Sequence, residues 1–358
     1  MEKVKLKDIC RLINGRAYKQ DELLDSGKYP VLRVGNFFSD KDFYYSDLEL
    51  EDDKYCDNGD LLFAWSASFG PKIWDGEKVI YHYHIWKMEL TDRVHKEYLY
   101  YYLFYLSERI KSEGHGGIMI HTTKSEMEER EFYLPSLDEQ IYVSEVIRKV
   151  EGIIYKRKEE LQQLDDLIKA LFVEMFGHQS HNEKGLSYET IDDVADIYLG
   201  ITHTPNYVDS GVMFISAKNT SRDFLDLCDV KYISREEFET APKGAKPLKG
   251  DVLFSRVGSN LGHPVILEDD IELCTFVSLG FLRTKGRVTN NYLKHWMRDD
   301  FFAEQVSSHV KGGGQPNLNT GWLKEFKIIV PDIEAQIAFD GFCDRVDKSK
   351  VVYPLTVF

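Results

Sequence analysis

Two histidines, His82 and His84, have the spacing at which side chains of one strand share a face, and imidazole pairs of this kind bind metal ions. No third ligand is indicated, and Tyr81, Tyr83 and Trp86 surround the pair with aromatic residues. Two other interpretations are open: a packed strand, or polar side chains that contact DNA. We therefore expect no metal site here.

The sequence also lacks the motifs that usually carry catalysis. It has no GxxxxGK[ST] loop, no GxSxG elbow, and no adjacent prolines such as those of the NPPY-type motif that amino-methyltransferases use to hold a flipped base. Pro331-Asp332 could begin a nuclease motif, but no acidic-x-Lys element follows it. We expect a protein with no catalytic residue and no cofactor.

The elements that must position any site occur twice along the chain. LKDICRLING, ending at Gly15, is echoed by IDDVADIYLG, ending at Gly200, at an offset of 185 residues. NGDLLFAWSASFG (58–70) returns as KGDVLFSRVGSNLG (249–262), and LPSLDEQ (134–140) returns as VPDIEAQ (330–336), at an offset that has grown to 196. Repeats of this length indicate a duplicated domain, with insertions mostly in the middle of the second copy.

Composition limits the partners and the compartment. The net charge of −15 opposes DNA binding by the whole surface, but residues 40–60 hold 9 of the acidic side chains against 2 basic ones, and residues 241–266 carry a local +3. Because affinity depends on where cations lie, we expect weak DNA binding by the chain alone and a basic partner. The 5 scattered cysteines without CxxC spacing and the absence of a long apolar run predict a cytoplasmic protein with reduced thiols and no membrane span.

Each repeat has the pattern of a mixed α+β fold. Short strand-like runs alternate with Gly, Asp and Asn turn signals. One amphipathic helix per repeat follows, at residues 97–113 and 291–310, then a Gly-rich loop and a last strand ending at Pro135 or Pro331.

Residues 141–176 have the pattern of a long coiled-coil helix of about 54 Å. Arg157 is the one polar residue of the seam, where we expect it to set register or reach solvent. The alternative is a helix folded back on its own domain. The matching segment from residue 337 begins with the same pattern but fails at Ser349 and Lys350, so the second helix should be short. The predicted partner-helix seam comprises Ile147, Val150, Ile154, Leu161, Leu164, Ile168 and Leu171.

The doubled Pro-x-x-x-x-Gln element (135–140 and 331–336), each copy running into a helix, resembles the specificity subunit of type I restriction-modification systems. GDVLFSRVGSNLG (250–262) and the Tyr-Leu pairs at 98–99 and 292–293 are similar to that family too. The resemblance implies two tandem target-recognition domains joined by long antiparallel coiled-coil helices. It implies that each domain binds one half of a bipartite site in double-stranded DNA, that the helices set the spacer, and that two modification (methyltransferase) subunits and the restriction subunits are partners.

On this basis we expect four parts: a first target-recognition domain (1–140), a central conserved helix (141–177), a second target-recognition domain (178–336) and a shortened C-terminal conserved helix (337–358). Two alternatives remain: the same architecture serving a type II enzyme with fused restriction and methylation, or a coiled-coil scaffold that binds protein or glycan.

Sequence recognition in the major groove needs polar side chains presented from loops, and the matched loops supply candidates in both repeats. Any one of them could instead be an ordinary turn residue. The copies differ at most of these positions, so the two half-sites should differ. In the first repeat the candidates are Arg33, Asn36, Ser66, Ser68, His82, His84, His115, His121 and Lys124. In the second they are Ser216, Lys218, Asn219, Arg256, Ser259, Asn260, Lys311, Gln315, Asn317 and Asn319.

Overall fold

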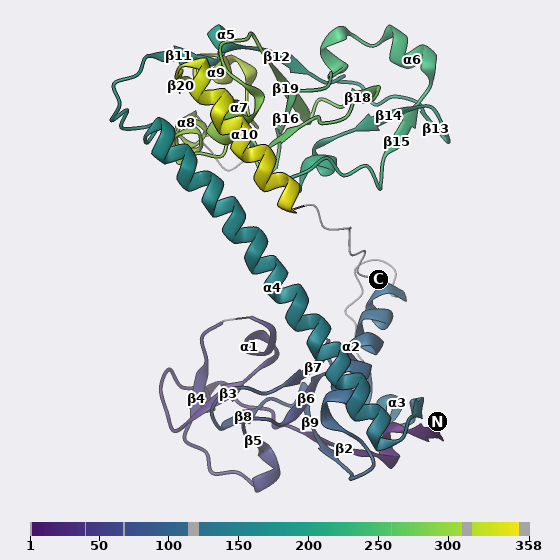
Figure 1. Cartoon of the computed structure of the whole chain (residues 1–358). Coiled ribbons are helices and arrows are strands. Elements are labelled where there is room, and N and C mark those ends of the chain that lie inside the picture. The colour runs from purple at the N-terminus through teal and green to yellow at the C-terminus, as the bar shows by residue number, and fades with distance from the viewer. Residues whose placement is uncertain are drawn as a thin grey trace. The chain divides into compact units, whose positions relative to one another are not determined.

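The protein is described here from a computed structural model, which describes residues 2–39, 41–66, 69–113, 122–258, 260–309 and 317–350. The chain forms two compact units, unit 1 (Met1–Lys156) and unit 2 (Arg157–Phe358). A single helix, α4 (Leu137–Phe176), begins in unit 1 and ends in unit 2 (Figure 1). Within the described part of the chain, no helix is long and apolar enough to cross a membrane.

Unit 1 consists of two four-stranded sheets, a two-stranded ribbon and a few helices (Figure 1). The first sheet is antiparallel, and in sheet order its strands are β2 (Cys10–Asn14), β9 (Ile85–Leu90), β6 (Leu61–Ala64) and β7 (Gly70–Ile73). The second sheet contains β4 (Tyr44–Ser46), β3 (Tyr29–Leu32), β8 (Val79–Tyr81) and β5 (Tyr55–Cys56). The ribbon pairs β1 (Glu2–Lys5) with β10 (Glu131–Leu134), and the helices are α1 (Val34–Phe38), α2 (Lys96–Glu113) and α3 (Lys124–Glu128).

Unit 2 repeats this plan. Its antiparallel sheet contains β12 (Ala195–Leu199), β19 (Leu279–Thr284), β16 (Val252–Ser255) and β17 (Pro264–Ile266). Its second sheet contains β13 (Tyr207–Val208), β15 (Lys231–Ile233), β14 (Val212–Ile215) and β18 (Leu273–Thr275), and its ribbon pairs β11 (Tyr188–Thr190) with β20 (Lys327–Ile329). Its helices are α5 (Ile191–Val194), α6 (Arg235–Thr240), α7 (Asn290–Trp296), α8 (Asp300–His309), α9 (Thr320–Glu325) and α10 (Ile333–Lys350).

The two units share the order of the antiparallel sheet, the ribbon and three strands of the second sheet, which confirms the expected duplicated α+β domain. In each unit the second sheet contains one parallel pair of strands, β3 with β8 or β14 with β18; the pair is central in unit 1, whereas β18 is an edge strand in unit 2. The fourth strand of that sheet differs: β5 pairs with β8 in unit 1, whereas β13 pairs with β15 at the opposite edge in unit 2.

The expected second helix, 291–310, is wrong as one element, because the chain forms α7 and α8 with a break between them. The carboxylate of Asp299 accepts a hydrogen bond from the backbone N–H of Phe301 at 2.9 Å and so satisfies a free donor in the first turn of α8. This local bond competes with continuation of α7, so one amphipathic pattern gives two helices.

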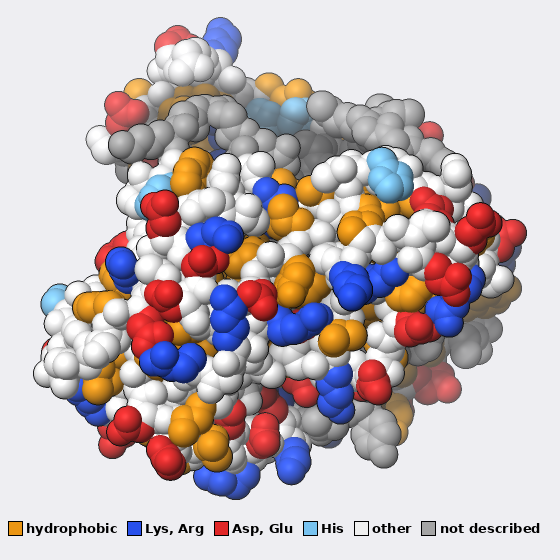
Figure 2. Space-filling view, turned by 90° about the horizontal axis from the view of Figure 1, so that it is seen from above, with side chains coloured by type: hydrophobic (Ala, Val, Ile, Leu, Met, Phe, Trp, Pro, Cys, Tyr) orange, Lys and Arg blue, Asp and Glu red, His pale blue; other side chains and the backbone are white. Residues whose placement is uncertain are grey.

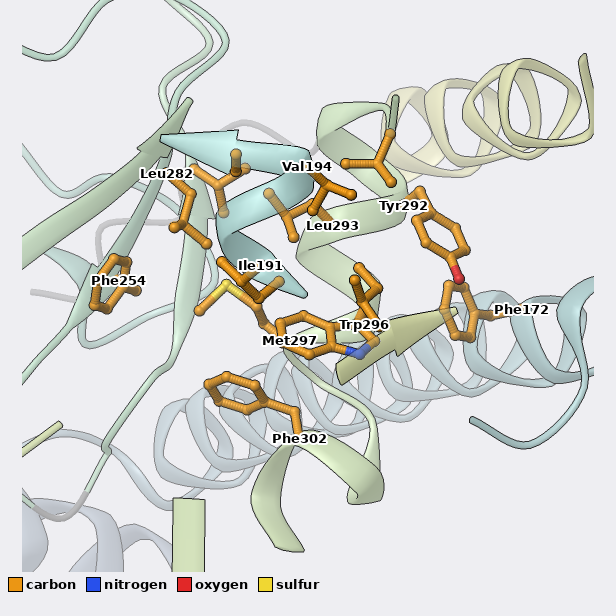
Figure 3. Close-up of a cluster of buried hydrophobic side chains, with 14 of the residues drawn as sticks. Phe172, Ile191, Val194, Phe254, Leu282, Tyr292, Leu293, Trp296, Met297 and Phe302 are labelled. Carbon is orange, nitrogen blue, oxygen red and sulfur yellow. The ribbon is translucent and has the colours of Figure 1, made fainter. Parts of the chain in front are cut away.

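Within unit 2, α10 runs antiparallel to the end of α4. Phe339 of α10 packs on Phe172 and Phe176 of α4, with ring centroids 5.5 Å from each, while Lys350 at the other end of α10 contacts Asp165 at 2.6 Å. The α4 end of this pair belongs to the largest core of the unit, where Phe172 lies beside Tyr292 of α7 (Figure 3).

The seam residues fall on both parts of α4. In unit 2, Ile168 is buried in the core, and Leu164 and Leu171 pack against it. In unit 1, Ile147 and Ile154 are half-buried and Val150 is exposed. Leu161 is half-buried.

Arg157 lies at the end of α10. Its Nη2 donates to the backbone carbonyls of Ser349 at 3.0 Å and Lys350 at 3.5 Å. The last carbonyls of a helix have no partner within that helix, so the guanidinium caps the C-terminus of α10. This contact gives a physical reason for the polar residue in an otherwise apolar seam.

Candidate nucleic-acid interface

A glycine at the end of the first anchor brings the two sheets of each unit together. A Cβ on Gly15 would overlap the backbone carbonyl of Tyr81, and a Cβ on Gly200 would overlap that of Thr275. Only glycine allows such a close approach of two backbones. The repeated anchor is therefore a structural requirement, and it places the following residue of each unit against the turn that ends β8 or β18.

That turn, residues 82–84 in unit 1 and 276–278 in unit 2, is held by equivalent bonds. The N–H of His82 donates to the carbonyl of Leu32 at 2.9 Å, and that of Phe276 donates to the carbonyl of Ile215, also at 2.9 Å. The expectation that His82 and His84 share a strand is wrong: they flank the middle residue of a turn, because the chain reverses between β8 and β9.

One side chain in each unit clamps the carbonyl of the middle turn residue. The indole Nε1 of Trp65 donates to the carbonyl of Tyr83 at 2.9 Å, and Nη1 of Arg256 donates to the carbonyl of Val277 at 3.1 Å. Burial lowers the pKa of Arg256, and its Nε donates to the carbonyl of Leu318 at 3.2 Å. Part of the Arg256 guanidinium is therefore used in hydrogen bonds within the unit.

The imidazoles of unit 1 lie in an aromatic cluster. The rings of His82 and His84 are 4.9 Å apart, and His84 lies 5.0 Å from Trp65. Burial, with the nearby His84 and Arg33, lowers the pKa of His82 to about 4, and burial also lowers the pKa of His84. Both are therefore neutral at pH 7 and can offer a donor or an acceptor without charge. Among the described residues, no group of three His, Cys, Asp or Glu could hold a metal ion.

Asn36 and Asn219 hold the loop that follows β3 in unit 1 and β14 in unit 2. Asn36 Nδ2 donates to the carbonyls of Lys41 and Asp42, and Asn219 Nδ2 donates to those of Asp226 and Asp229. Asn219 is also buried. As direct DNA contacts these two predictions are not supported by the geometry, because the amides are used within the loop; their role is to position it.

The charged candidates on these loops already have partners. The guanidinium of Arg33 lies 5.1 Å from the ring centre of Tyr44, and Nζ of Lys218 lies 2.9 Å from the Asp229 carboxylate. Arg33, Ser66 and Ser216 are half-buried, and Lys218 is exposed. An exposed ion pair of this type contributes little to stability, so Lys218 can exchange Asp229 for a phosphate at low cost.

A third segment joins the same place in each unit. The N–H of Thr122 donates to the carbonyl of Trp65 at 3.4 Å, and that of Leu318 donates to the carbonyl of Arg256 at 2.8 Å. Lys124 begins α3 and pairs with Glu128 at 3.6 Å.

The candidates on the equivalent segment of unit 2 differ in their role. Asn319 is the N-cap of α9: its side chain accepts the N–H of Gly321, so a structural use accounts for it. Asn317 is exposed. Asn260 is exposed as well, and its side-chain amide has no partner within the described chain; its backbone carbonyl accepts the Ser255 hydroxyl.

We call these joined segments the recognition edge of each unit. In unit 1 the recognition edge comprises residues 33–36, 65–66, 82–84 and 122–124. In unit 2 it comprises residues 216–219, 256–258, 276–278 and 317–319. Other candidates lie outside the described residues: Ser68, His115, His121, Ser259, Lys311 and Gln315.

One feature of unit 2 was missed from the sequence, the long connection between residues 220 and 231. Asp223 in this connection contacts Arg298 at 2.8 Å and His263 at 3.3 Å, while Phe224 is exposed. A hydrogen bond from His263, with the nearby Arg298 charge, lowers the pKa of Asp223 to about 2. The growing offset between the repeats indicated an insertion in the second copy, but it did not predict the contacts that hold this connection to Arg298 and His263.

The Pro-x-x-x-x-Gln element has a structural function. Gln140 Nε2 donates to the carbonyls of Arg93 and Pro135, and its Oε1 accepts the N–H of His95 at 2.8 Å. Gln336 makes the equivalent three bonds in unit 2, including one from the N–H of Thr289, the N-cap of α7, at 2.9 Å. Both glutamines are fully buried, so the motif fixes the start of each repeat helix and is no ligand site.

Charge on the visible surface is mixed. In the view of Figure 2, the described Lys and Arg side chains lie among Asp and Glu side chains and do not form one basic field on that face. This mixture on that face agrees with the net charge of −15.

The two recognition edges are equivalent parts of a duplicated domain, with corresponding backbone bonds around the turn and different side chains. The chain belongs to the type I restriction modification DNA specificity domain family, whose sequence model matches residues 1–164 and again residues 187–348. It is similar to the type I restriction enzyme MjaVIII specificity subunit of Methanocaldococcus jannaschii, with 22% identity over 371 residues, covering 97% of this chain and 86% of the relative.

Two solved structures share the fold along almost the whole chain. The S subunit of the type I restriction-modification system from M. genitalium matches with a TM-score of 0.55 and 14% identity, covering 98% of this chain and 90% of that one. A chain from work on complex assembly and conformational transition of the type I R-M system matches with a TM-score of 0.53 and 17% identity, covering 98% and 91%.

Proposed function

We propose that the chain is the specificity subunit of a type I restriction-modification complex and that each unit binds one half of a bipartite DNA site. The observation that carries the proposal is the pair of recognition edges. The backbone bonds around their turns correspond, while the side chains of the turns differ: Tyr83 against Val277, His84 against Ser278. A frame kept twice with different tips suits two readers of different sequences.

The chain itself is assigned no catalytic step. Methyl transfer belongs to the modification subunits and cleavage to the restriction subunits, as the family relationship implies. The matched family and the similar subunit both favour a type I system over the type II fused enzyme. A scaffold that binds protein or glycan gives no reason for two matched edges with different polar tips.

A matched surface supports docking of the same partner on each unit. At the start of α4, Leu137 (44% exposed) and Ile141 (37%) form an apolar pair, and at the start of α10, Ile333 (38%) and Ile337 (58%) form its equivalent. Acidic side chains occupy the first turn of both helices. We propose that each pair contacts one modification subunit through apolar side chains rimmed by Lys or Arg, which would also supply the basic surface that this chain lacks.

The helices are proposed to set the spacer between the half-sites. The contacts that support this role are the cap of Arg157 on α10 and the ion pair between Lys350 and Asp165, since both fix the register of α10 on α4 within unit 2. The expected domain limits, at residues 140, 177 and 336, are part of this proposal.

The test is to co-express the chain with a type I modification subunit and map the methylated bases of a genome. The expected result is one bipartite, asymmetric motif. Replacing residues 1–135 by the equivalent domain of a relative should change one half of that motif and leave the other. Methylation that shows no bipartite motif, or a swap that changes both halves, would refute the proposal.

A further inference from the structure

Tyr83 is the middle residue of the turn in the recognition edge of unit 1, and both of its backbone groups are bound. Its N–H donates to the carbonyl of Arg16 at 3.0 Å, and its carbonyl accepts Trp65 Nε1 at 2.9 Å. The turn therefore has little freedom at this residue.

The ring of Tyr83 is also held in place. Its centre lies 3.9 Å from that of His84, 4.5 Å from His82 and 6.1 Å from Trp65, yet 38% of the residue remains exposed. Its hydroxyl has no hydrogen-bond partner within the described residues. An aromatic side chain that is ordered before binding loses little conformational entropy in a contact.

Unit 2 provides an internal comparison at the same position. The N–H of Val277 donates to the carbonyl of Ile201 at 2.9 Å, and its carbonyl accepts Nη1 of Arg256. The backbone bonds are the same as those of Tyr83, while the side chain changes from a phenol ring to an isopropyl group. One backbone frame therefore presents two different side chains at the middle of the turn.

We propose that Tyr83 contacts a base of the first half-site and helps to determine its sequence, an inference that rests on the proposed function. The ring can pack against a thymine methyl group or an exposed base face, and the hydroxyl can donate or accept at a base edge. At the matched position of the second half-site, Val277 offers a smaller, purely apolar contact.

The experiment uses the complex of the full chain with its modification subunit. Methylation rates are measured on the preferred duplex and on duplexes with single base changes in either half. Tyr83→Val, which introduces the residue that unit 2 carries in the same backbone setting, is the main variant, and Tyr83→Phe separates the ring from the hydroxyl. Tyr133→Ala is the matched control, because Tyr133 is an exposed tyrosine of the same unit on β10.

For Tyr83→Val we expect the preference for the native base to fall about 10-fold at one or two positions of the first half-site, the size of one lost base contact, with the second half unchanged. Tyr133→Ala should match the wild type. An unchanged preference, or a uniform loss of rate at every position, would overturn the role of Tyr83. If the wild-type complex itself shows no bipartite preference, the proposed function fails instead, so the two failures are distinguishable.

Discussion

Trp65 in unit 1 and Arg256 in unit 2 occupy equivalent positions, and each donates a hydrogen bond to the carbonyl of the middle turn residue. One is an aromatic ring and the other a cation. Their backbones are also bound alike, with the N–H of each donating to the carbonyl of the last turn residue, His84 or Ser278. The recognition edge therefore requires a donor of suitable reach at this position, and it leaves charge and shape free to vary with the half-site.

The opposite behaviour is found at positions where two backbones meet. Gly15 and Gly200 are kept because any side chain would overlap a carbonyl, and Gln140 and Gln336 are kept because each satisfies three backbone groups inside the fold. Comparing the units thus separates residues that build the frame from residues that the frame presents.

The largest effect should follow from breaking the frame at these glycines. We expect Gly15→Ala and Gly200→Ala each to destabilise the protein by about 3 kcal/mol, because a backbone carbonyl cannot move aside cheaply. Gly152→Ala is the matched control: nothing lies within 4 Å of a Cβ there, and in the middle of α4 alanine should stabilise by about 0.5 kcal/mol. Urea unfolding of the purified chain measures all three variants. If Gly15→Ala and Gly152→Ala unfold at the same urea concentration, the overlap of the new Cβ with a backbone carbonyl does not destabilise the protein.

An intermediate effect should follow from breaking the surface that both units keep. Ile141→Asp and Ile337→Asp place a charge in the matched apolar pairs, and each should cost the complex one of two bound modification subunits, with both lost in the double variant. Because both residues are exposed, the free chain should lose less than about 0.5 kcal/mol of stability. Light scattering of the purified complex gives the stoichiometry. Leu248→Asp, at another exposed leucine, is the control, and equal loss of subunits in it would count against the matched surface.

Much of the frame could be predicted from sequence because it repeats. The anchors around Gly15 and Gln140 recur with their order kept, and that repetition gave the duplicated α+β fold. The polar candidates could not be ranked, because their roles depend on hydrogen bonds that exist only in the folded loop. Asn219 resembles any loop asparagine until its bonds to the carbonyls of Asp226 and Asp229 are seen. The break between α7 and α8 was not predicted either, because one hydrogen bond to the side chain of Asp299 outweighs the amphipathic pattern.

The smallest effect concerns a difference between the units, since unit 1 has His82 where unit 2 has Phe276. Burial lowers the pKa of His82 from 6.5 to about 4 in the folded state, so the unfolded chain takes up the proton first as the pH falls. The free energy of unfolding therefore carries no penalty from His82 above pH 6.5, and it falls as the pH drops from 6.5 to about 4. Since the ring is only half-buried, solvent screens part of this effect, and we expect His82 to account for a loss of about 1 kcal/mol in the free energy of unfolding.

His82→Phe, which brings the unit 2 residue into unit 1, removes this titration. The variant should lose less stability than the wild type between pH 7 and about 4.5, when urea unfolding is measured across that range. His295 in unit 2, whose pKa burial lowers well below its usual value, titrates in both proteins and cancels in the difference. The ring of His84 lies 4.9 Å from that of His82, so any change in its titration on loss of His82 belongs to the measured difference. Parallel curves for the two proteins would mean that the turn of unit 1 accepts a proton as easily folded as unfolded, and the electrostatic contrast between the two recognition edges would then be absent.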